Sequence, residues 1–316
     1  MFSEGFGSKA KNRVLGKLFI DRNRDYRNTV FLAGAGRGGT TWVSEIINYD
    51  GRYRYIFEPF HPGRVKSVRS FRHKQYIRPD NRDGKYLKPA WNILSGKVRS
   101  SWTDRFYKGR FVYDRRLVKD IRMNLALYWL RRNFPEMPII LLLRHPCAVA
   151  ASRMKLGWRG SLAQTYLSQR ELVEDFLAPF EREIQAAEER DFDRYIFGWC
   201  IENYVPLRQF SEGELLVVFY ENFCERPREE VARTFRYLGR GFDDSVFAAM
   251  REPSPLARKE SAVLLGERPA DGWKRHVTPE QTKRAVEILA LFGLDGVYSE
   301  DPMPDPGAVK ALLRAK

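Results

Sequence analysis

The chain has 316 residues, and its apolar fraction of 43% with 14% aromatic residues is enough to build a packed globular core. Its longest aliphatic run, IILLL, is far shorter than the roughly 20 residues that a membrane-spanning helix needs, and Lys17 interrupts the N-terminal apolar stretch that a signal peptide would require. The formal net charge of +15 is concentrated in residues 61–110, which carry fourteen Lys and Arg against three Asp. A field of this sign favours an anionic partner.

The cysteines and histidines indicate neither a disulfide framework nor a metal site. Three cysteines stand far apart without metal-binding spacing, so a reducing, cytoplasmic setting is expected. The four histidines are too dispersed for a metal centre. Residues 1–27 form a basic leading segment, in which residues 11–20 mix basic and apolar side chains. Weak contact with a membrane surface therefore stays open beside an ordinary leading segment.

In chain order, short apolar stretches predicted to be β-strands alternate with stretches of helical spacing. The strands are expected at residues 30–33, 53–57, 117–119, 138–143 and 215–220, and the helices at 41–48, 124–134, from 146, 162 to about 210, 227–238 and 279–292. This alternation predicts an α/β fold with a doubly wound parallel sheet flanked by helices. We expect a single domain over 28–298, with 61–110 as a basic variable insertion near the substrate and 299–316 as a C-terminal tail.

A glycine-rich turn, GAGRGGTTW, follows the first strand. Gly34 and Gly39 have the spacing of a P-loop and Thr41 stands at its final hydroxyl, but Thr40 replaces the lysine that reaches a γ-phosphate. The backbone N–H groups of such a turn and the positive end of the next helix can converge on one anion. With Arg37 supplying charge, the turn predicts a P-loop-like site for a phosphate-like group. A glycine-rich turn without a ligand is the alternative.

A second motif, LLLRHPCAVAASRM, includes the most aliphatic strand and the helix after it. Arg144 leaves this strand at its carboxyl end, and Ser152 lies two turns along the helix. Ligands of open α/β sheets bind beyond the carboxyl ends of the strands, so both motifs are expected at one edge of the sheet. Together they predict a ligand with two phosphate groups. Alone, the second motif would indicate only a surface arginine and a solvent-facing serine.

These two motifs, in this order, resemble those of the sulfotransferases that use 3′-phosphoadenosine 5′-phosphosulfate (PAPS). Residues 199–239 and 270–288 are similar to the central helix region and the C-terminal closing segment of that family, and Glu58-Pro59 resembles the Glu-Pro motif of its carbohydrate-type and bacterial members. The resemblance implies sulfuryl transfer without a metal, with adenosine 3′,5′-bisphosphate (PAP) as product. It also accounts for the missing lysine, because PAPS has no γ-phosphate.

The resemblance implies roles for individual residues. The 5′-phosphosulfate is expected at Gly36, Arg37, Gly38, Gly39, Thr40 and Thr41, and the 3′-phosphate at Arg144 and Ser152. Trp42 is the expected adenine-stacking residue, with a core tryptophan as the alternative. The residues expected to close over the nucleotide are Arg258, Lys259, Trp273 and Lys274.

The catalytic residues are predicted from the same resemblance. Sulfuryl transfer resembles phosphoryl transfer, in which positioning and electrostatics provide most of the catalysis. The stretch RLVKDIR lacks the histidine base of the cytosolic members, so Glu58 is predicted to be the general base and His61 its reserve. Alternatively, Glu58 neutralises Arg37 across the strand ends. Lys119 is expected to stabilise the bridging oxygen, with a plain surface lysine as the alternative, and Arg122 to contact an anionic acceptor.

The Glu-Pro motif and the basic insertion favour a carbohydrate or glycan-like acceptor, preferably an anionic one. A lipid-linked sugar, a natural-product alcohol and a peptide tyrosine stay open. Two other classes of protein are considered. A P-loop kinase should have the loop lysine and an aspartate after a strand; the loop lysine is absent, and the strands at 138–143 and 215–220 are followed by Arg144 and Glu221. A non-catalytic anion- or nucleic-acid-binding module would explain the charge but not the two motifs, and no nucleic acid partner is expected.

Overall fold

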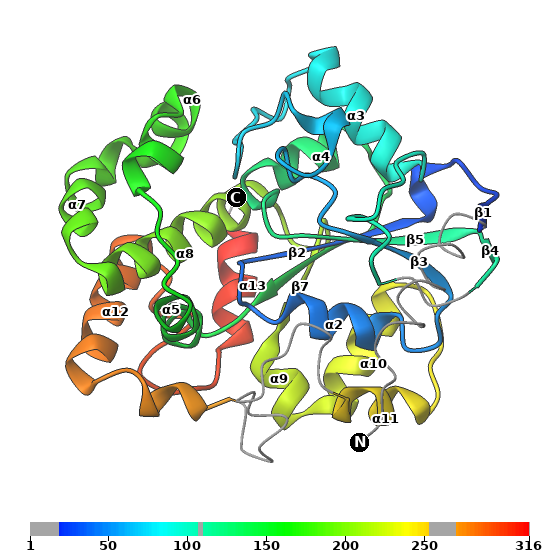
Figure 1. Cartoon of the computed structure of the whole chain (residues 1–316). Coiled ribbons are helices and arrows are strands. Elements are labelled where there is room, and N and C mark those ends of the chain that lie inside the picture. Colours follow the sequence, from blue (N-terminus) through cyan, green and yellow to red (C-terminus); the bar gives the residue numbers. More distant parts are fainter. Residues whose placement is uncertain (1–18, 107–109, 253–269, 316) are drawn as a thin grey trace, which may run out of the picture.

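The computed structural model describes residues 19–106, 110–252 and 270–315, and a five-stranded parallel sheet lies at its centre (Figure 1). The strand order is β3-β5-β2-β6-β7. The strands are β2 (Thr29–Gly34), β3 (Tyr53–Phe57), β5 (Arg115–Asp120), β6 (Ile139–Leu143) and β7 (Leu216–Phe219). A separate parallel pair joins β1 (Ile20–Asp21) to β4 (Val112–Tyr113). The predicted α/β class with a parallel sheet is confirmed.

Both faces of the sheet are buried, because side chains alternate along a strand and each face is covered. In β2, Phe31 and Ala33 belong to the larger apolar cluster, whereas Val30 and Leu32 belong to the smaller one. Strands covered on both sides read as continuous apolar runs, and this explains why they are so distinct in the sequence.

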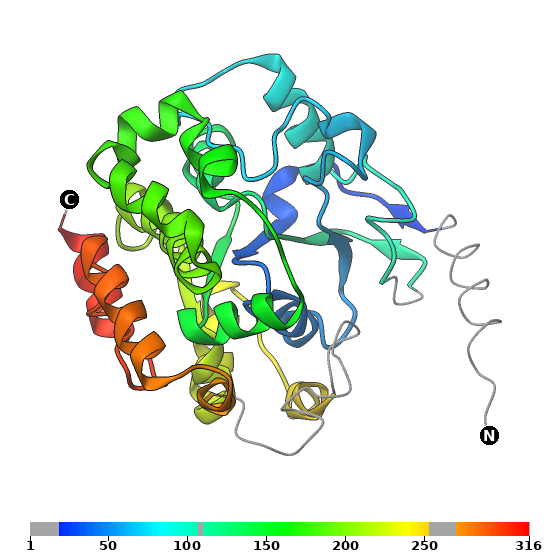
Figure 2. The ribbon, with the colours of Figure 1, turned by 60° about the vertical axis from the view of Figure 1, so that its left-hand side comes forward.

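Helices cover the two faces of the sheet (Figure 1). Those against the smaller cluster are α2 (Thr40–Ile47), α9 (Tyr220–Glu225), α10 (Pro227–Tyr237) and α11 (Ser245–Arg251). The larger cluster is covered by α3 (Gly84–Leu94), α4 (Leu127–Asn133), α5 (Pro146–Lys155), α7 (Glu181–Ala186), α8 (Asp191–Gln209), α12 (Pro279–Leu291) and α13 (Pro306–Arg314), with the short α6 (Arg170–Leu172) beside it. The C-terminal helices α12 and α13 pack against α8, and Figure 2 shows them in orange and red on the outer side.

Three regions differ from the sequence-based expectations. The helical region expected from 162 to about 210 is a series of short α, 3₁₀ and π turns followed by α8. The insertion 61–110 contains an ordered helix, α3, although Pro89 lies inside it. Residues 299–316, expected to be a tail, include α13, whose Val309 and Leu313 are buried in the core.

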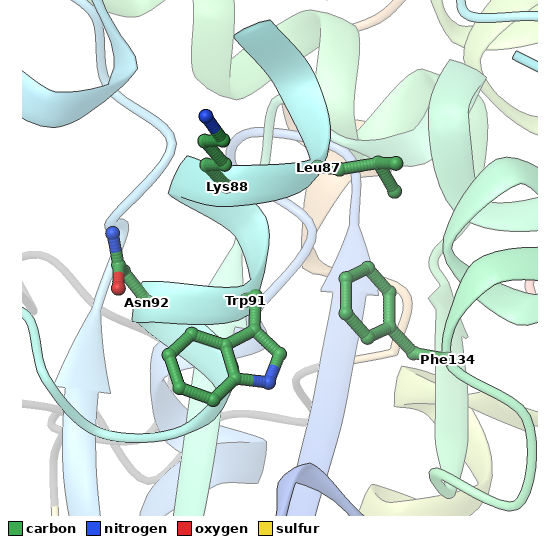
Figure 3. A pocket seen from close by; sticks show the side chains of 5 residues that line it. All are labelled: Leu87, Lys88, Trp91, Asn92 and Phe134. Carbon is green, nitrogen blue, oxygen red and sulfur yellow. The ribbon is translucent and has the colours of Figure 1, made fainter. Parts of the chain in front are cut away.

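A groove of about 490 Å³ lies between α3 and the end of α4, lined by Leu87, Lys88, Trp91, Asn92 and Phe134 (Figure 3). It is near the amino ends of the strands, because the carbonyl of Leu94 in α3 accepts a bond from Thr29, the first residue of β2. The groove is therefore remote from the carboxyl edge of the sheet, where the two motifs lie.

Among the described residues, none of the helices combines the length and apolarity needed to cross a bilayer. The same residues contain no group of three or more His, Cys, Asp or Glu that is suited to a metal ion. Cys147, Cys200 and Cys224 are free thiols.

Candidate active site

The glycine loop between β2 and α2 has the backbone of an anion-binding turn. Gly39 has a φ of 92° and Arg37 a φ of 76°, both in the left-handed region. A Cβ on Gly39 would lie 2.5 Å from the ring of Tyr220, so a side chain does not fit there. Gly39 is also the N-cap of α2 and has no side chain to cap it, so the helix presents the N–H groups of Thr40 and Thr41 to an anion.

The structure brings the two motifs together. The guanidinium Nε of Arg37 donates to the hydroxyl of Ser152 on α5 at 3.0 Å. Arg144, at the end of β6, directs Nη1 toward the Arg37 carbonyl at 3.5 Å and lies 3.9 Å from the centre of the Tyr220 ring. The Arg144 carbonyl accepts a bond from the Trp199 indole. The predicted 5′-phosphosulfate and 3′-phosphate residues therefore share one edge of the sheet.

Trp42 lies in the core beneath the loop. Its side chain is 7% exposed, and its indole N–H donates to the carbonyl of Met250 at 3.2 Å. Its ring packs against Tyr220 and Phe223. These are the contacts of the core tryptophan considered as the alternative to adenine stacking.

The predicted closing residues are only partly described. Arg258 and Lys259 lie outside the described residues. Trp273 is buried and stacks on His145, with ring centres 4.3 Å apart, while the exposed Lys274 lies over its ring at 5.8 Å. Trp273 thus joins the C-terminal segment to the turn after Arg144.

Glu58 is the centre of a buried ion-pair network at the end of β3. Its two carboxylate oxygens each accept one bond at 2.7 Å, from Lys119 Nζ and from Arg122 Nη1. The network links β3 to β5, because Lys119 belongs to β5 and Arg122 follows it. The alternative partner Arg37 instead bonds to Ser152. Arg122, expected to contact an acceptor, is used at least in part to hold Glu58.

The backbone of Glu58 is strained and anchored. Its φ of 41° is unusual for a residue with a side chain, and such a conformation costs about 1–3 kcal/mol. Its N–H donates to the Lys119 carbonyl at 2.7 Å, and its carbonyl accepts the indole N–H of Trp102 at 3.1 Å. Strain retained at a buried carboxylate on the ligand edge of a sheet indicates a functional position.

Burial and the neighbouring charges together shift the pKa values of this network. Burial opposes ionisation of Glu58, but the charges of Lys119 and Arg122 outweigh it and lower the pKa of the carboxyl. Burial also opposes ionisation of Lys119 and so lowers its pKa, although the negative charge of Glu58 partly offsets this change. Asp120, which accepts the N–H groups of Phe60 and Arg122, is so deeply buried that its pKa rises to about 6. Glu58 is therefore ionised at neutral pH, and Asp120 is protonated only below about pH 6.

His61 and Trp102 belong to the insertion and extend the candidate site beyond Glu58. The two rings meet edge to face with centres 5.3 Å apart. Burial and the charge of Arg122 lower the pKa of His61, so the ring is neutral at neutral pH. Arg64 and Arg105 lie over the Trp102 ring at 5.3 and 4.9 Å.

Sequence reasoning missed Trp102 and Arg153, which contact Glu58 and the glycine loop, and Glu202, which contacts Arg153. Arg153 follows Ser152 directly in the second motif, and this adjacency was the available signal. Trp102 stands out in the sequence only as one of several aromatics in a basic stretch. Glu202 lies on α8 and offered no local signal.

A glycine turn joined to a second strand-end arginine on a parallel sheet flanked by helices is the architecture of a P-loop-like α/β protein. The chain belongs to the sulfotransferase family, whose family model matches residues 29–244. The predicted family and enzyme class are thereby confirmed.

The chain is also similar to solved structures of sulfotransferases. The sulfotransferase domain from the curacin biosynthetic pathway is 16% identical, with 83% of this chain and 96% of that chain covered and a TM-score of 0.45. A mouse sulfotransferase complexed with PAP is 12% identical, with 99% and 100% covered and a TM-score of 0.45. A sulfotransferase from Alicyclobacillus acidocaldarius is 14% identical, with 92% and 96% covered and a TM-score of 0.42. The curated proteins contain no significant match.

Proposed function

We propose that this protein transfers the sulfuryl group of PAPS to a hydroxyl of a carbohydrate or glycan-like acceptor that carries negative charge. The observation that carries the proposal is the bond between Arg37 and Ser152, which joins the predicted 3′-phosphate motif to the glycine loop. PAPS has two phosphate-bearing ends, and a ligand with a single phosphate would need only one of these motifs. We keep the reducing, cytoplasmic setting as part of the proposal, on the basis of the free cysteines.

In the proposed reaction the acceptor oxygen attacks sulfur in line, the S–O bond to the 5′-phosphate breaks, and the hydroxyl proton passes to Glu58. The lowered pKa of Glu58 keeps it ionised and ready to accept a proton at neutral pH, although it makes the carboxylate a weaker base. A loose transition state of this kind needs little help from a strong base. Arg37 and the N–H groups at the start of α2 are proposed to neutralise the phosphosulfate, with Lys119 at the bridging oxygen.

The proposed preference for an anionic acceptor rests on the side chains around Trp102. Within the described residues, neither Arg64 nor Arg105 forms an ion pair with a carboxylate, yet both lie over the indole. The same indole donates to the Glu58 carbonyl. An aromatic face flanked by two cations suits a sugar ring bearing a carboxylate or sulfate.

Calorimetric titration of PAP into wild type and Arg144→Ala, with ATP and duplex DNA as comparison ligands, tests donor binding. We expect micromolar binding of PAP that is lost in Arg144→Ala and is much tighter than binding of ATP or DNA. Equal binding of PAP and ATP would contradict the proposal and favour a kinase, whereas a preference for DNA would favour a nucleic-acid-binding module.

Transfer of labelled sulfate from PAPS to matched neutral and anionic sugars tests the chemistry. We expect Glu58→Gln to lower turnover by about 10²- to 10⁴-fold, the usual contribution of a general base, while PAP affinity is retained. His61→Gln is the matched variant. If His61→Gln loses turnover and Glu58→Gln does not, the base is His61.

A further inference from the structure

A buried charged cluster contacts the backbone of the glycine loop. Arg153, on α5, is 4% exposed, and its Nε donates to the carbonyl of Gly36 at 3.2 Å. Its Nη2 donates to Glu202 at 3.3 Å. One guanidinium therefore connects the backbone of the donor loop to a carboxylate on α8.

Glu202 gathers side chains from three parts of the chain. It is 1% exposed and accepts bonds from Arg153, from the Tyr166 hydroxyl at 2.9 Å, and from the ammonium of Lys74. Burial opposes its ionisation, but the charges of Lys74 and Arg153 outweigh it and lower the pKa of Glu202 to about 2. Glu202 is thus a fixed negative charge that holds two cations in place.

Lys74 brings the insertion into this cluster. It lies in the basic segment 61–110 and has a left-handed φ of 56°, a strained value for a lysine. The strain is retained while its ammonium contacts Glu202 and Tyr166. The acceptor-side segment is therefore connected to the donor loop through two buried ion pairs, Lys74–Glu202 and Glu202–Arg153.

We propose that Arg153 and Glu202 are positioning residues that set the conformation of the donor loop and couple it to the acceptor-side insertion through Lys74. The proposal rests on the proposed function. In a trans peptide the C=O and N–H groups point in opposite directions. Arg153, by holding the Gly36 carbonyl, turns the N–H of Arg37 to the opposite side of the loop. This fixes an anion-binding peptide before the donor arrives.

The first measurement is PAP affinity by calorimetry for wild type, Arg153→Lys, Glu202→Gln and Lys74→Met. Arg153→Lys keeps the charge that pairs with Glu202 but cannot donate in two directions as a guanidinium does, so we expect at least a tenfold loss of affinity. Glu202→Gln should lose a similar amount. Lys74→Met should lose about two- to fivefold, and adding it to Glu202→Gln should cause no further loss, as for residues in one network.

The matched control is Asp21→Asn. Asp21 is also a buried carboxylate between two cations, Arg54 and Arg116, but it belongs to the β1–β4 pair. Asp21→Asn should lower the melting temperature and leave PAP affinity unchanged. If Arg153→Lys and Glu202→Gln behave like Asp21→Asn, their role is stability alone and the proposal is overturned.

Amide hydrogen exchange of the ligand-free protein gives a readout that does not depend on the donor. Arg153→Lys should speed exchange in residues 35–41, and Asp21→Asn should not. Unchanged exchange there would overturn the positioning role even if affinity fell. A wild type that does not bind PAP would instead refute the proposed function. If Glu202→Gln fails to fold, the affinity and exchange of Arg153→Lys alone test the positioning role.

Discussion

The Arg37 guanidinium and the Ser152 hydroxyl are 3.0 Å apart, although 115 positions separate the two residues in the chain. The contact is possible because β2 and β6 are neighbours in the sheet, so the loop after one strand meets the helix after the other. The proposed donor site is thus assembled from the ends of the central strand β2 and its neighbour β6.

Removal of this contact should weaken donor binding. Ser152→Ala removes the bond to Arg37 Nε and the predicted bond to the 3′-phosphate, and a hydrogen bond to a charged group contributes about 1.5–3 kcal/mol, so PAP affinity should fall roughly tenfold or more. Calorimetry gives the result directly. Ser70→Ala is the control, because its hydroxyl donates to the Lys85 carbonyl on the exposed surface of the insertion. Equal affinities of the two variants would argue against a role for Ser152.

Gly39→Ala should abolish PAP binding. The new methyl group would lie 2.5 Å from the Tyr220 ring, and the φ of 92° is unfavourable for alanine, so the turn has to change shape. Gly241→Ala is the comparison, since none of the residues that the structure describes lies within 4 Å of the position that its new methyl group would take and its φ is not left-handed. Both variants can be followed by calorimetry and thermal melting. Normal PAP binding by Gly39→Ala would show that the turn is not the donor site.

Trp42 should matter for stability rather than for adenine recognition. Trp42→Ala should cost about 3–5 kcal/mol of unfolding free energy, as for other buried tryptophans, measured by urea denaturation. Trp42→Phe keeps the packing against Tyr220 and Phe223 and should bind PAP within about threefold of wild type. A large loss of PAP affinity in a stable Trp42→Phe protein would restore the adenine-stacking role.

The free energy of unfolding at low pH should depend on Glu202. Its pKa in the folded state, about 2, lies below the ordinary 4.5, so the unfolded chain binds more protons between these values. The ion pairs stabilise the fold fully above pH 4.5, and roughly 3 kcal/mol should be lost as the pH falls to about 2. Urea unfolding at several pH values should show this slope in wild type and not in Glu202→Gln.

The pKa of Asp120 is shifted in the opposite direction to that of Glu202. Its pKa is raised from 3.8 to about 6, so its ionisation costs stability as the pH rises through this interval. Asp120→Asn should therefore remove a loss of stability at higher pH, whereas Glu202→Gln removes a loss at lower pH. The same direction of change in both variants would contradict the assigned ionisation states.

The sequence predicted the features that depend on local pattern. Strands buried on both faces are continuous apolar runs, and the glycine turn and the Arg144 motif are local signatures, so the sheet and the donor edge could be placed in advance. Helix α3 was missed because its lysines and Pro89 mask an amphipathic pattern. The partners of Glu58 and the contact of Lys74 with Glu202, 128 positions apart, depend on tertiary packing that one sequence does not reveal.

The strand order has a consequence for how new acceptor specificities can arise. The insertion leaves the sheet at β3 and returns at β5, and these strands pair directly from Tyr53 with Arg115 to Phe57 with Lys119. We expect that residues 61–110 of the segment between them can be exchanged as a unit while the β2–β6 pair, which carries both predicted donor motifs, stays intact. Loop grafting should therefore redirect this scaffold to other hydroxyl compounds, provided that Glu58 is kept and the graft retains a lysine to contact Glu202.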